Sequence, residues 1–165
     1  MALEEGRISG VFHTMSEENV RLVLRQPWVA IASDGSAINL EADGVPHPRN
    51  YGTNPRALGY YVREGVLTLE DAVRKMTSLP AQILGVADRG VLREGAAADV
   101  VIFDPLKVRD TATFERPKSY PEGIPYVLVN GEVVIDEGRH TGARPGRAVH
   151  GMGYRRAATP ATATR

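Results

Sequence analysis

The chain has 165 residues and no cysteine, and its 20 acidic and 20 basic side chains give a formal net charge of zero. This balance provides no field that would draw the chain to nucleic acid or to an anionic membrane, and the lack of cysteine excludes disulfides and thiolate ligands within it. No apolar run approaches the roughly 20 residues of a membrane span, and residues 1–10 lack the apolar core of a signal peptide. We therefore expect a cytoplasmic protein without nucleic-acid or membrane partners.

The first predicted elements are a helix and a short strand. Ser16 is suited to cap a helix with acidic residues in its first turn, and Pro27 ends that helix. Trp28–Ala32 is short and continuously apolar, which is typical of a strand buried on both faces of a parallel sheet. A helix leading directly into such a strand indicates one αβ step of a barrel or of a doubly wound sheet.

A long loop over residues 35–55 follows, and loops of this length after buried strands often carry function. Asn54 and Pro55 have the pattern of an N-cap and a first helical position, so a helix is predicted to begin there. Thr68 is predicted to cap a further helix that carries an apolar stripe. Pro80–Leu84 is expected to form only a short turn.

Beyond residue 86, the sequence pattern indicates β-strands rather than helices. Ala98–Phe103 is predicted to be a strand. Tyr126–Val129 and Glu132–Ile135 flank Asn130-Gly131, whose residues tolerate a positive φ, and this arrangement is a strong hairpin signal.

Several segments share motifs with one enzyme family: Ser33-Asp34-Gly35, His47–Thr53, Pro55–Gly59, Glu70–Ala81, Tyr120–Ile124 and Gly138–Gly146. Among them, His47-Pro48-Arg49 and Thr141–Gly146 are the most specific. The turn and strand at Gly90–Asp104 are shared by the wider superfamily. Together these motifs, spread from Met15 to Gly146, resemble the C-terminal portion of the N-acyl-D-amino-acid deacylase (D-aminoacylase) branch of the amidohydrolase superfamily.

The resemblance implies an α/β fold: the C-terminal end of a metal-dependent (β/α)8 barrel, with its last strand (Trp28–Ser33) and following helices, plus part of a small β-rich domain. Residues 1–86 would form the barrel end, residues 87–150 the β-rich part and residues 151–165 a disordered tail. The family's early histidine pair has no counterpart here, since the four histidines are His13, His47, His140 and His150. The metal ligands other than Asp34 are therefore expected to be absent from this chain.

Asp34 is the principal catalytic candidate, because barrel enzymes carry catalytic groups where strands end. The resemblance implies that its carboxylate takes a proton from a zinc-activated water and later delivers one to the leaving nitrogen. A weaker possibility is that Asp34 is itself a metal ligand, and a turn formed with Gly35 is the purely structural alternative. Asp99 and Asp104 are better explained by turn chemistry than by metal binding.

Arg49 and His47 are the candidates for substrate binding. A guanidinium fork suits a free carboxylate, which an N-acyl amino acid carries, and the resemblance brings Arg49 near the substrate. His47 is a candidate pocket residue. The structural alternatives are a surface arginine and an ordinary loop histidine.

The sequence thus predicts the C-terminal part of a zinc-dependent hydrolase that cleaves the amide C–N bond of N-acyl-D-amino acids. Alone it is expected to be inactive, because a catalytic zinc usually needs three protein ligands. Two alternatives are a non-catalytic remnant or partner subunit that docks on a separate barrel chain, and a cyclic-amide hydrolase of the hydantoinase or dihydroorotase type. Expected partners are the small N-acyl amino acid and either the missing N-terminal barrel portion or a second copy of the chain.

Overall fold

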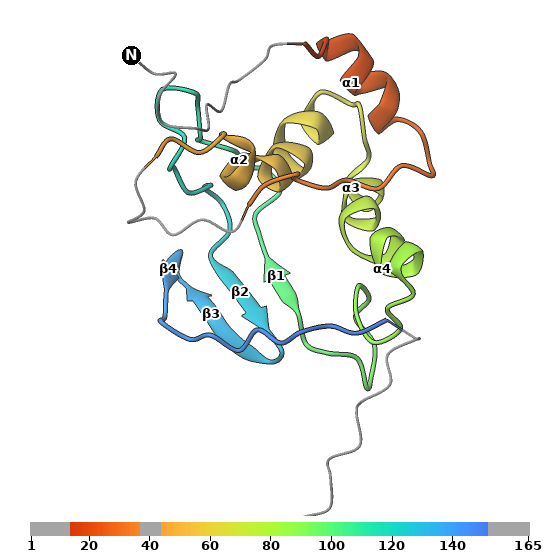
Figure 1. The fold of residues 1–165 in the computed structure, drawn as a ribbon, viewed down its shortest axis with the longest axis vertical. Helices are drawn as coiled ribbons and strands as arrows, with labels where there is room; N and C mark the ends of the chain where they lie inside the picture. The colour runs from red at the N-terminus through yellow and green to blue at the C-terminus, as the bar shows by residue number, and fades with distance from the viewer. Residues whose placement is uncertain (1–13, 37–43, 152–165) are drawn as a thin grey trace, which may run out of the picture.

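The computed structural model describes residues 14–36 and 44–151, which form a group of helices beside one antiparallel sheet (Figure 1). His13 and residues 152–165, most of the predicted tail, lie outside the described residues. No helix within the described ranges is long and apolar enough to cross a membrane. The elements in chain order are α1 (Glu17–Leu24), α2 (Arg49–Arg56), the π-helix η1 (Ala57–Tyr61), α3 (Leu69–Met76), α4 (Ser78–Leu84), β1 (Val100–Ile102), β2 (Tyr126–Val129), β3 (Glu132–Asp136) and β4 (Arg139–His140).

The helix predicted after Ser16 is confirmed as α1. The Ser16 hydroxyl accepts a hydrogen bond from the backbone N–H of Asn19 at 3.2 Å. Glu17 and Glu18 occupy the first turn, where their charges favour the positive end of the helix dipole.

Aromatic and charged side chains attach α1 to η1. Arg21 Nη2 donates a hydrogen bond to the hydroxyl of Tyr60 at 2.9 Å, and the guanidinium of Arg56 lies 4.4 Å from the centre of the Tyr60 ring. The Tyr61 hydroxyl donates to Glu17 at 3.3 Å. Burial is the main cause that raises the pKa of Tyr61, which keeps this hydroxyl a donor.

The predicted start of the second helix at Asn54 is wrong, because α2 begins at Arg49 and contains Pro55 in its interior. Proline lacks the N–H that an α-helix uses, so one intrahelical bond is missing at Pro55. The helix continues directly into the wider turns of η1 from Ala57. An interior proline thus directly precedes a π-helical segment, and each of these features is a known source of irregularity in a helix.

The helix predicted after Thr68 is confirmed as α3, with the Thr68 hydroxyl accepting from the backbone N–H of Asp71 at 3.1 Å. The short turn predicted at Pro80–Leu84 is instead part of α4, which begins at Ser78. Pro80 lies in its first turn, where a missing N–H costs no intrahelical bond. Gly85 ends α4 in the left-handed conformation at φ +67°.

The strand predicted at residues 28–33 is not formed in this structure. None of the four strands of the described sheet pairs with this segment, and a strand without a neighbour cannot satisfy its backbone groups. The backbone N–H of Ile31 donates instead to the carbonyl of Lys75 at 2.9 Å. Trp28 is 70% exposed, so this segment is not buried on both faces in this structure.

The strands predicted within residues 98–103, 126–129 and 132–135 are formed. The four strands form an antiparallel sheet in the order β1-β2-β3-β4, with Val101 opposite Val127. Asn130 and Gly131 join β2 to β3 with φ values of +50° and +84°, as a tight hairpin requires. A second turn of the same kind, which the sequence analysis did not predict, joins β3 to β4.

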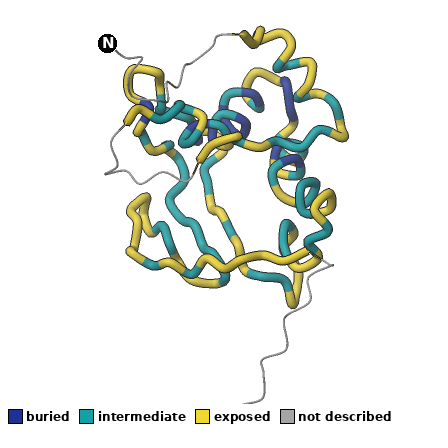
Figure 2. The backbone as a smooth tube through the Cα atoms, viewed as in Figure 1, coloured by how far each residue is buried: buried dark blue, intermediate teal, exposed yellow. Residues whose placement is uncertain are grey.

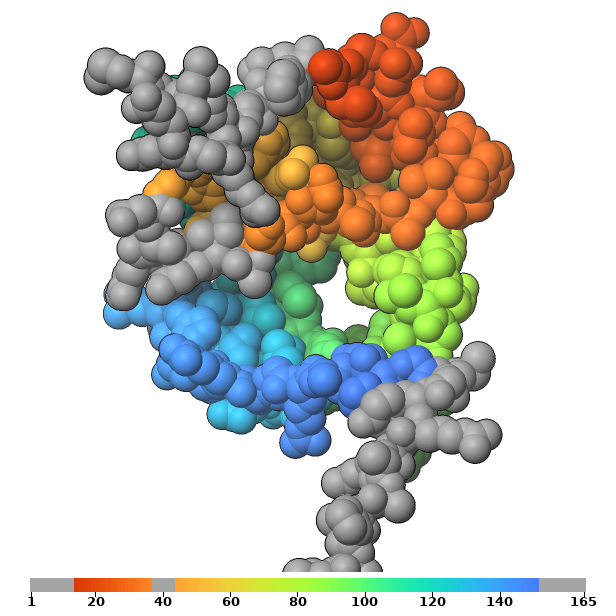
Figure 3. Space-filling view, viewed as in Figure 1, coloured from red at the N-terminus to blue at the C-terminus, as the bar shows by residue number. Residues whose placement is uncertain are grey.

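Buried residues concentrate on the helical side of the molecule, as Figure 2 shows. The core consists of Leu58, Tyr61, Val66, Leu67, Ala72 and Val108. A space-filling view shows an opening between the sheet and the α3–α4 side (Figure 3). Large apolar side chains outside this core remain exposed, and they include Trp28, Ile83, Leu84, Leu92, Val101 and Ile102.

Candidate active site

Asp34 lies at a bend of the chain and not within regular structure. Its φ is +48°, a left-handed conformation that aspartate adopts more readily than most residues. The backbone N–H of Gly35 donates to the hydroxyl of Ser33 at 3.1 Å and so stabilises the bend. The positive φ of Asp34 and the bond between Gly35 and Ser33 favour the turn alternative for the backbone, while the Asp34 carboxylate remains exposed.

The carboxylate of Asp34 is paired with the guanidinium of Arg49. Arg49 Nη1 lies 3.0 Å from Asp34 Oδ2, and the two side chains are 45% and 86% exposed. The structure therefore brings the catalytic candidate and the substrate-binding candidate into direct contact across 15 positions of sequence. Because both groups reach solvent, each is accessible to a small molecule.

His47 supports the start of α2, the helix that carries Arg49. Its Nδ1 accepts a hydrogen bond from the backbone N–H of Arg49 at 3.1 Å. Its ring packs edge-on against Phe114 with 5.2 Å between ring centres. His47 thus satisfies one of the free N–H groups at a helix start and fixes the direction from which Arg49 extends.

Asn50 attaches the bend at Asp34 to α2, a role that the sequence analysis missed. Its side-chain amide donates to the carbonyl of Ser36 at 3.1 Å. A Cβ at Gly35 would lie only 3.1 Å from the Cα of Asn50, so the two backbones approach closely. Only the position of Asn50, directly after Arg49 in the His-Pro-Arg-Asn motif, could have indicated this role.

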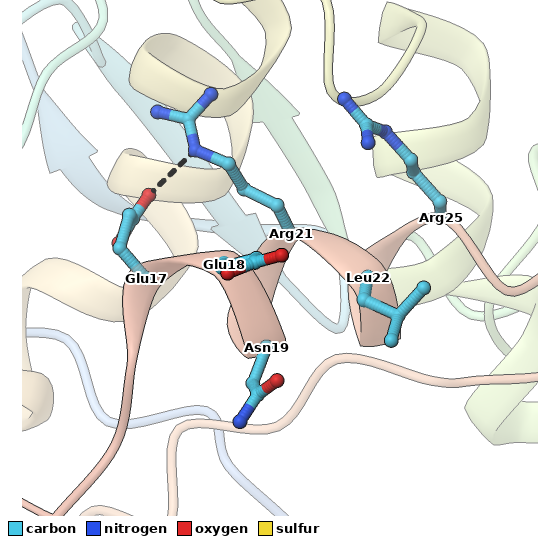
Figure 4. Close-up of a pocket in the computed structure, with 6 residues that line it drawn as sticks. All are labelled: Glu17, Glu18, Asn19, Arg21, Leu22 and Arg25. Carbon is cyan, nitrogen blue, oxygen red and sulfur yellow. Dashed lines mark hydrogen bonds and ion pairs between the residues drawn. The ribbon is translucent and has the colours of Figure 1, made fainter.

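A hollow of about 420 Å³ lies elsewhere, along α1. Its lining residues are Glu17, Glu18, Asn19, Arg21, Leu22 and Arg25 (Figure 4). They belong to one helix and its C-cap, they carry both signs of charge, and Glu17 is already paired with Arg21 at 3.0 Å. This hollow contains none of the three candidate residues and offers no convergent chemistry.

The described residues do not fit a metal site. No group of three or more potential ligands among histidine, aspartate and glutamate comes together within them. The one candidate ligand, Asp34, faces a guanidinium, whose positive charge opposes a metal cation. We therefore assign no metal-dependent step to these residues.

The sequence matches the profile of the amidohydrolase family over residues 4–135. The N-acyl-D-glutamate deacylase of Alcaligenes xylosoxydans xylosoxydans is 46% identical over 138 residues, which cover 83% of this chain and 27% of that protein. The D-aminoacylase of the same organism is 46% identical over 140 residues, covering 84% of this chain and 28% of that protein. These matches confirm the resemblance on which the sequence analysis relied.

A solved structure gives the same result. The N-acyl-D-glutamate deacylase of Bordetella bronchiseptica superposes with a TM-score of 0.67 at 46% identity, over 76% of this chain and 27% of that one. That enzyme was solved with zinc and a phosphonate inhibitor that mimics the tetrahedral intermediate of its reaction. The present chain thus spans only about a quarter of the length of the curated relatives it matches.

Proposed function

Because the chain belongs to the amidohydrolase family, we propose that it is the C-terminal part of a hydrolase that cleaves the amide bond of N-acyl-D-amino acids. The relatives at 46% identity are deacylases of this substrate class. The observation that carries the proposal is the contact between Asp34 and Arg49 at 3.0 Å. A carboxylate base and a carboxylate-binding cation adjacent to each other suit a substrate whose own carboxylate is close to its amide.

Asp34 is the proton carrier in this proposal. Water adds its oxygen to the amide carbonyl carbon, and the carboxylate of Asp34 accepts the proton that the water loses. When the C–N bond breaks, Asp34 returns that proton to the leaving nitrogen. The products are a carboxylic acid and a free amino acid, and Asp34 is ionised again.

Arg49 is the anchor for the α-carboxylate of the substrate. A guanidinium offers two parallel N–H groups to a carboxylate, which fixes both position and orientation. In this structure, Nη1 of the same guanidinium lies 3.0 Å from Asp34 Oδ2. His47 orients Arg49 through the hydrogen bond that its Nδ1 accepts from the backbone N–H of Arg49.

Residues 28–33 become the last barrel strand in the longer protein. Their apolar sequence suits burial between layers, and their backbone is not committed to the described sheet. Zinc is present in the solved relative, whereas the described residues of this chain do not gather three ligands. The remaining ligands therefore come, in this proposal, from the part of the relatives' length that this chain does not match.

A chimeric enzyme tests this function. The stretch of the Alcaligenes N-acyl-D-glutamate deacylase that matches this chain is replaced by residues 14–146, and amine release from N-acetyl-D-glutamate is measured. We expect turnover, with no hydrolysis of dihydroorotate or of a hydantoin. A folded chimera that binds zinc but releases no amine supports the alternative of a non-catalytic remnant, and hydrolysis of a cyclic amide instead contradicts the proposed substrate class.

A further inference from the structure

Lys75 is a fully buried lysine for which the proposed chemistry has no use. Its side chain is 0% exposed, although it lies in the last turn of α3. Burial of an ammonium group is costly unless hydrogen bonds and a counter-charge replace its water. The partners of Lys75 therefore indicate why this position holds a lysine.

Those partners belong to the chain that leads to Asp34. Lys75 Nζ donates to the carbonyl of Val29 at 3.0 Å and also to the carbonyl of Gln26. The carboxylate of Asp71 lies 3.8 Å away and supplies the counter-charge. Two carbonyls of an irregular segment are thus held by one buried cation.

Arg74, the neighbour of Lys75, binds the same segment. Arg74 Nη2 donates to the carbonyl of Pro27 at 2.5 Å, while its Nε donates to Asp71 at 3.0 Å. The carbonyl of Lys75, free because it lies at a helix end, accepts the N–H of Ile31 at 2.9 Å. The last turn of α3 therefore holds backbone groups at positions 26, 27, 29 and 31.

We propose that Lys75, assisted by Arg74, is a positioning residue that sets the place of Asp34 through the irregular backbone of residues 26–36. This inference rests on the proposed role of Asp34. Upstream, α3 holds the segment up to Ile31, and downstream α2 holds it through Arg49 and Asn50. Asp34 lies between the two attachments, so release of the upstream one displaces its carboxylate from Arg49.

Two spectroscopic signals of the full chain report on this segment, and one position can be modified chemically. Trp28 is the only tryptophan and lies within the held segment, so a change in its fluorescence anisotropy at unchanged molecular size reports the mobility of that segment. The side-chain carboxyl resonance of Asp34, assigned by its disappearance in Asp34→Asn, reports the pairing with Arg49. The absence of cysteine means that Lys75→Cys can be alkylated at one site, and 2-bromoethylamine there restores an ammonium at nearly the length of lysine.

The decisive experiment compares the full chain with Lys75→Met. We expect lower Trp28 anisotropy, and amide exchange over residues 26–36 faster on the order of tenfold, while exchange in β2 and β3 is unchanged. The Asp34 resonance should move to the position it has in Arg49→Met, and alkylated Lys75→Cys should restore the original position. An Asp34 resonance unchanged in Lys75→Met, or equal loss of protection in the sheet, would overturn the proposal.

A second variant covers the case in which Lys75→Met does not fold. Arg74→Met removes the bond to Pro27 and the ion pair with Asp71 from a side chain that is 38% exposed, but it leaves both carbonyl bonds of Lys75 in place. We expect the same changes at smaller amplitude. Unchanged exchange over residues 26–36 in this variant overturns the proposal. None of these readouts needs turnover, so they remain interpretable if the chimeric enzyme proves inactive.

Discussion

The guanidinium of Arg49 contacts the carboxylate of Asp34 at 3.0 Å in a position where 86% of the Asp34 side chain is open to solvent. An exposed ion pair of this kind contributes only about 0–1 kcal/mol. In the proposed function, a substrate carboxylate would therefore replace Asp34 at Arg49 at little cost. That exchange would leave Arg49 bound to substrate and Asp34 free to act on the neighbouring amide.

Substitution of Arg49 is expected to weaken substrate binding in the chimeric enzyme. Loss of charge-assisted hydrogen bonds, at about 1.5–3 kcal/mol, raises KM for N-acetyl-D-glutamate roughly ten- to a hundredfold in Arg49→Met. Arg49→Lys keeps the charge but loses the paired N–H groups of the guanidinium, so its KM should fall between those of the parent and of Arg49→Met. Arg139→Met, which removes an exposed arginine on β4, is the matched control, and an equal KM for all four proteins would show that Arg49 is not the anchor.

Gly59→Ala is expected to destabilise the fold, although alanine favours helices. A Cβ at Gly59 would lie 2.2 Å from the backbone oxygen of Val108, so the helix and the loop must separate. Overpacking costs about 1–3 kcal/mol, which outweighs the gain of up to about 1 kcal/mol from helix propensity. Urea unfolding measures the difference. Gly146→Ala, where nothing lies within 4 Å of the added Cβ, should leave stability unchanged, and a Gly59→Ala chain as stable as the parent contradicts the observed contact.

Asp99 is expected to make stability depend on pH. The backbone N–H of Asn130, which donates to Asp99 at 2.8 Å, and the guanidinium of Arg89 hold the pKa of Asp99 below its ordinary value. A lowered pKa in the folded chain means that this contribution is present above the ordinary pKa and is lost as the pH falls through the folded one. The free energy of unfolding of the parent should therefore exceed that of Asp99→Asn at pH 7, and the difference should shrink as the pH falls to the ordinary pKa of an aspartate and below it. A difference that is constant with pH would exclude this explanation, and Asp136→Asn is the control.

The chain of 165 residues by itself is expected to release amine from N-acyl-D-amino acids no faster than buffer, with or without added zinc. No three potential metal ligands come together among its described residues, whereas a catalytic zinc usually has three protein ligands. Amine release and zinc content of the purified chain are the measurements. Zinc-dependent turnover by the parent that Asp34→Asn abolishes would refute the account of missing ligands.

Local signals in the sequence predicted the elements that depend on local chemistry. The caps at Ser16 and Thr68 and the Asn130-Gly131 turn are each determined within a few residues, and each is confirmed. The strand predicted at residues 28–33 is absent from this structure, because strand formation depends on neighbouring strands elsewhere in the fold. The start of α2 was predicted too far along the chain, because Pro55, usually a first-turn residue, lies inside this helix. The helix begins at Arg49, whose backbone N–H donates to His47.

The candidate site was predictable only in part, for the same reason. The motifs around Asp34 and Arg49 identified both residues, but no local pattern predicted the contact between two side chains 15 positions apart. Nothing in the sequence predicted that Lys75 is buried, since a lysine beside the apolar stripe of an amphipathic helix is ordinarily solvated. Its partners are carbonyls some 46 and 49 positions away, which only the folded chain brings together.

The turnover number of the chimeric enzyme with Asp34→Asn tests the central claim most directly. Asparagine keeps the shape of the side chain but cannot accept a proton from water, so kcat should fall by roughly 10²–10⁴-fold with KM within about twofold. Asp136→Asn, at an exposed position on β3, should retain the parental kcat. An Asp34→Asn enzyme with parental kcat would contradict the assignment of Asp34 as the proton carrier.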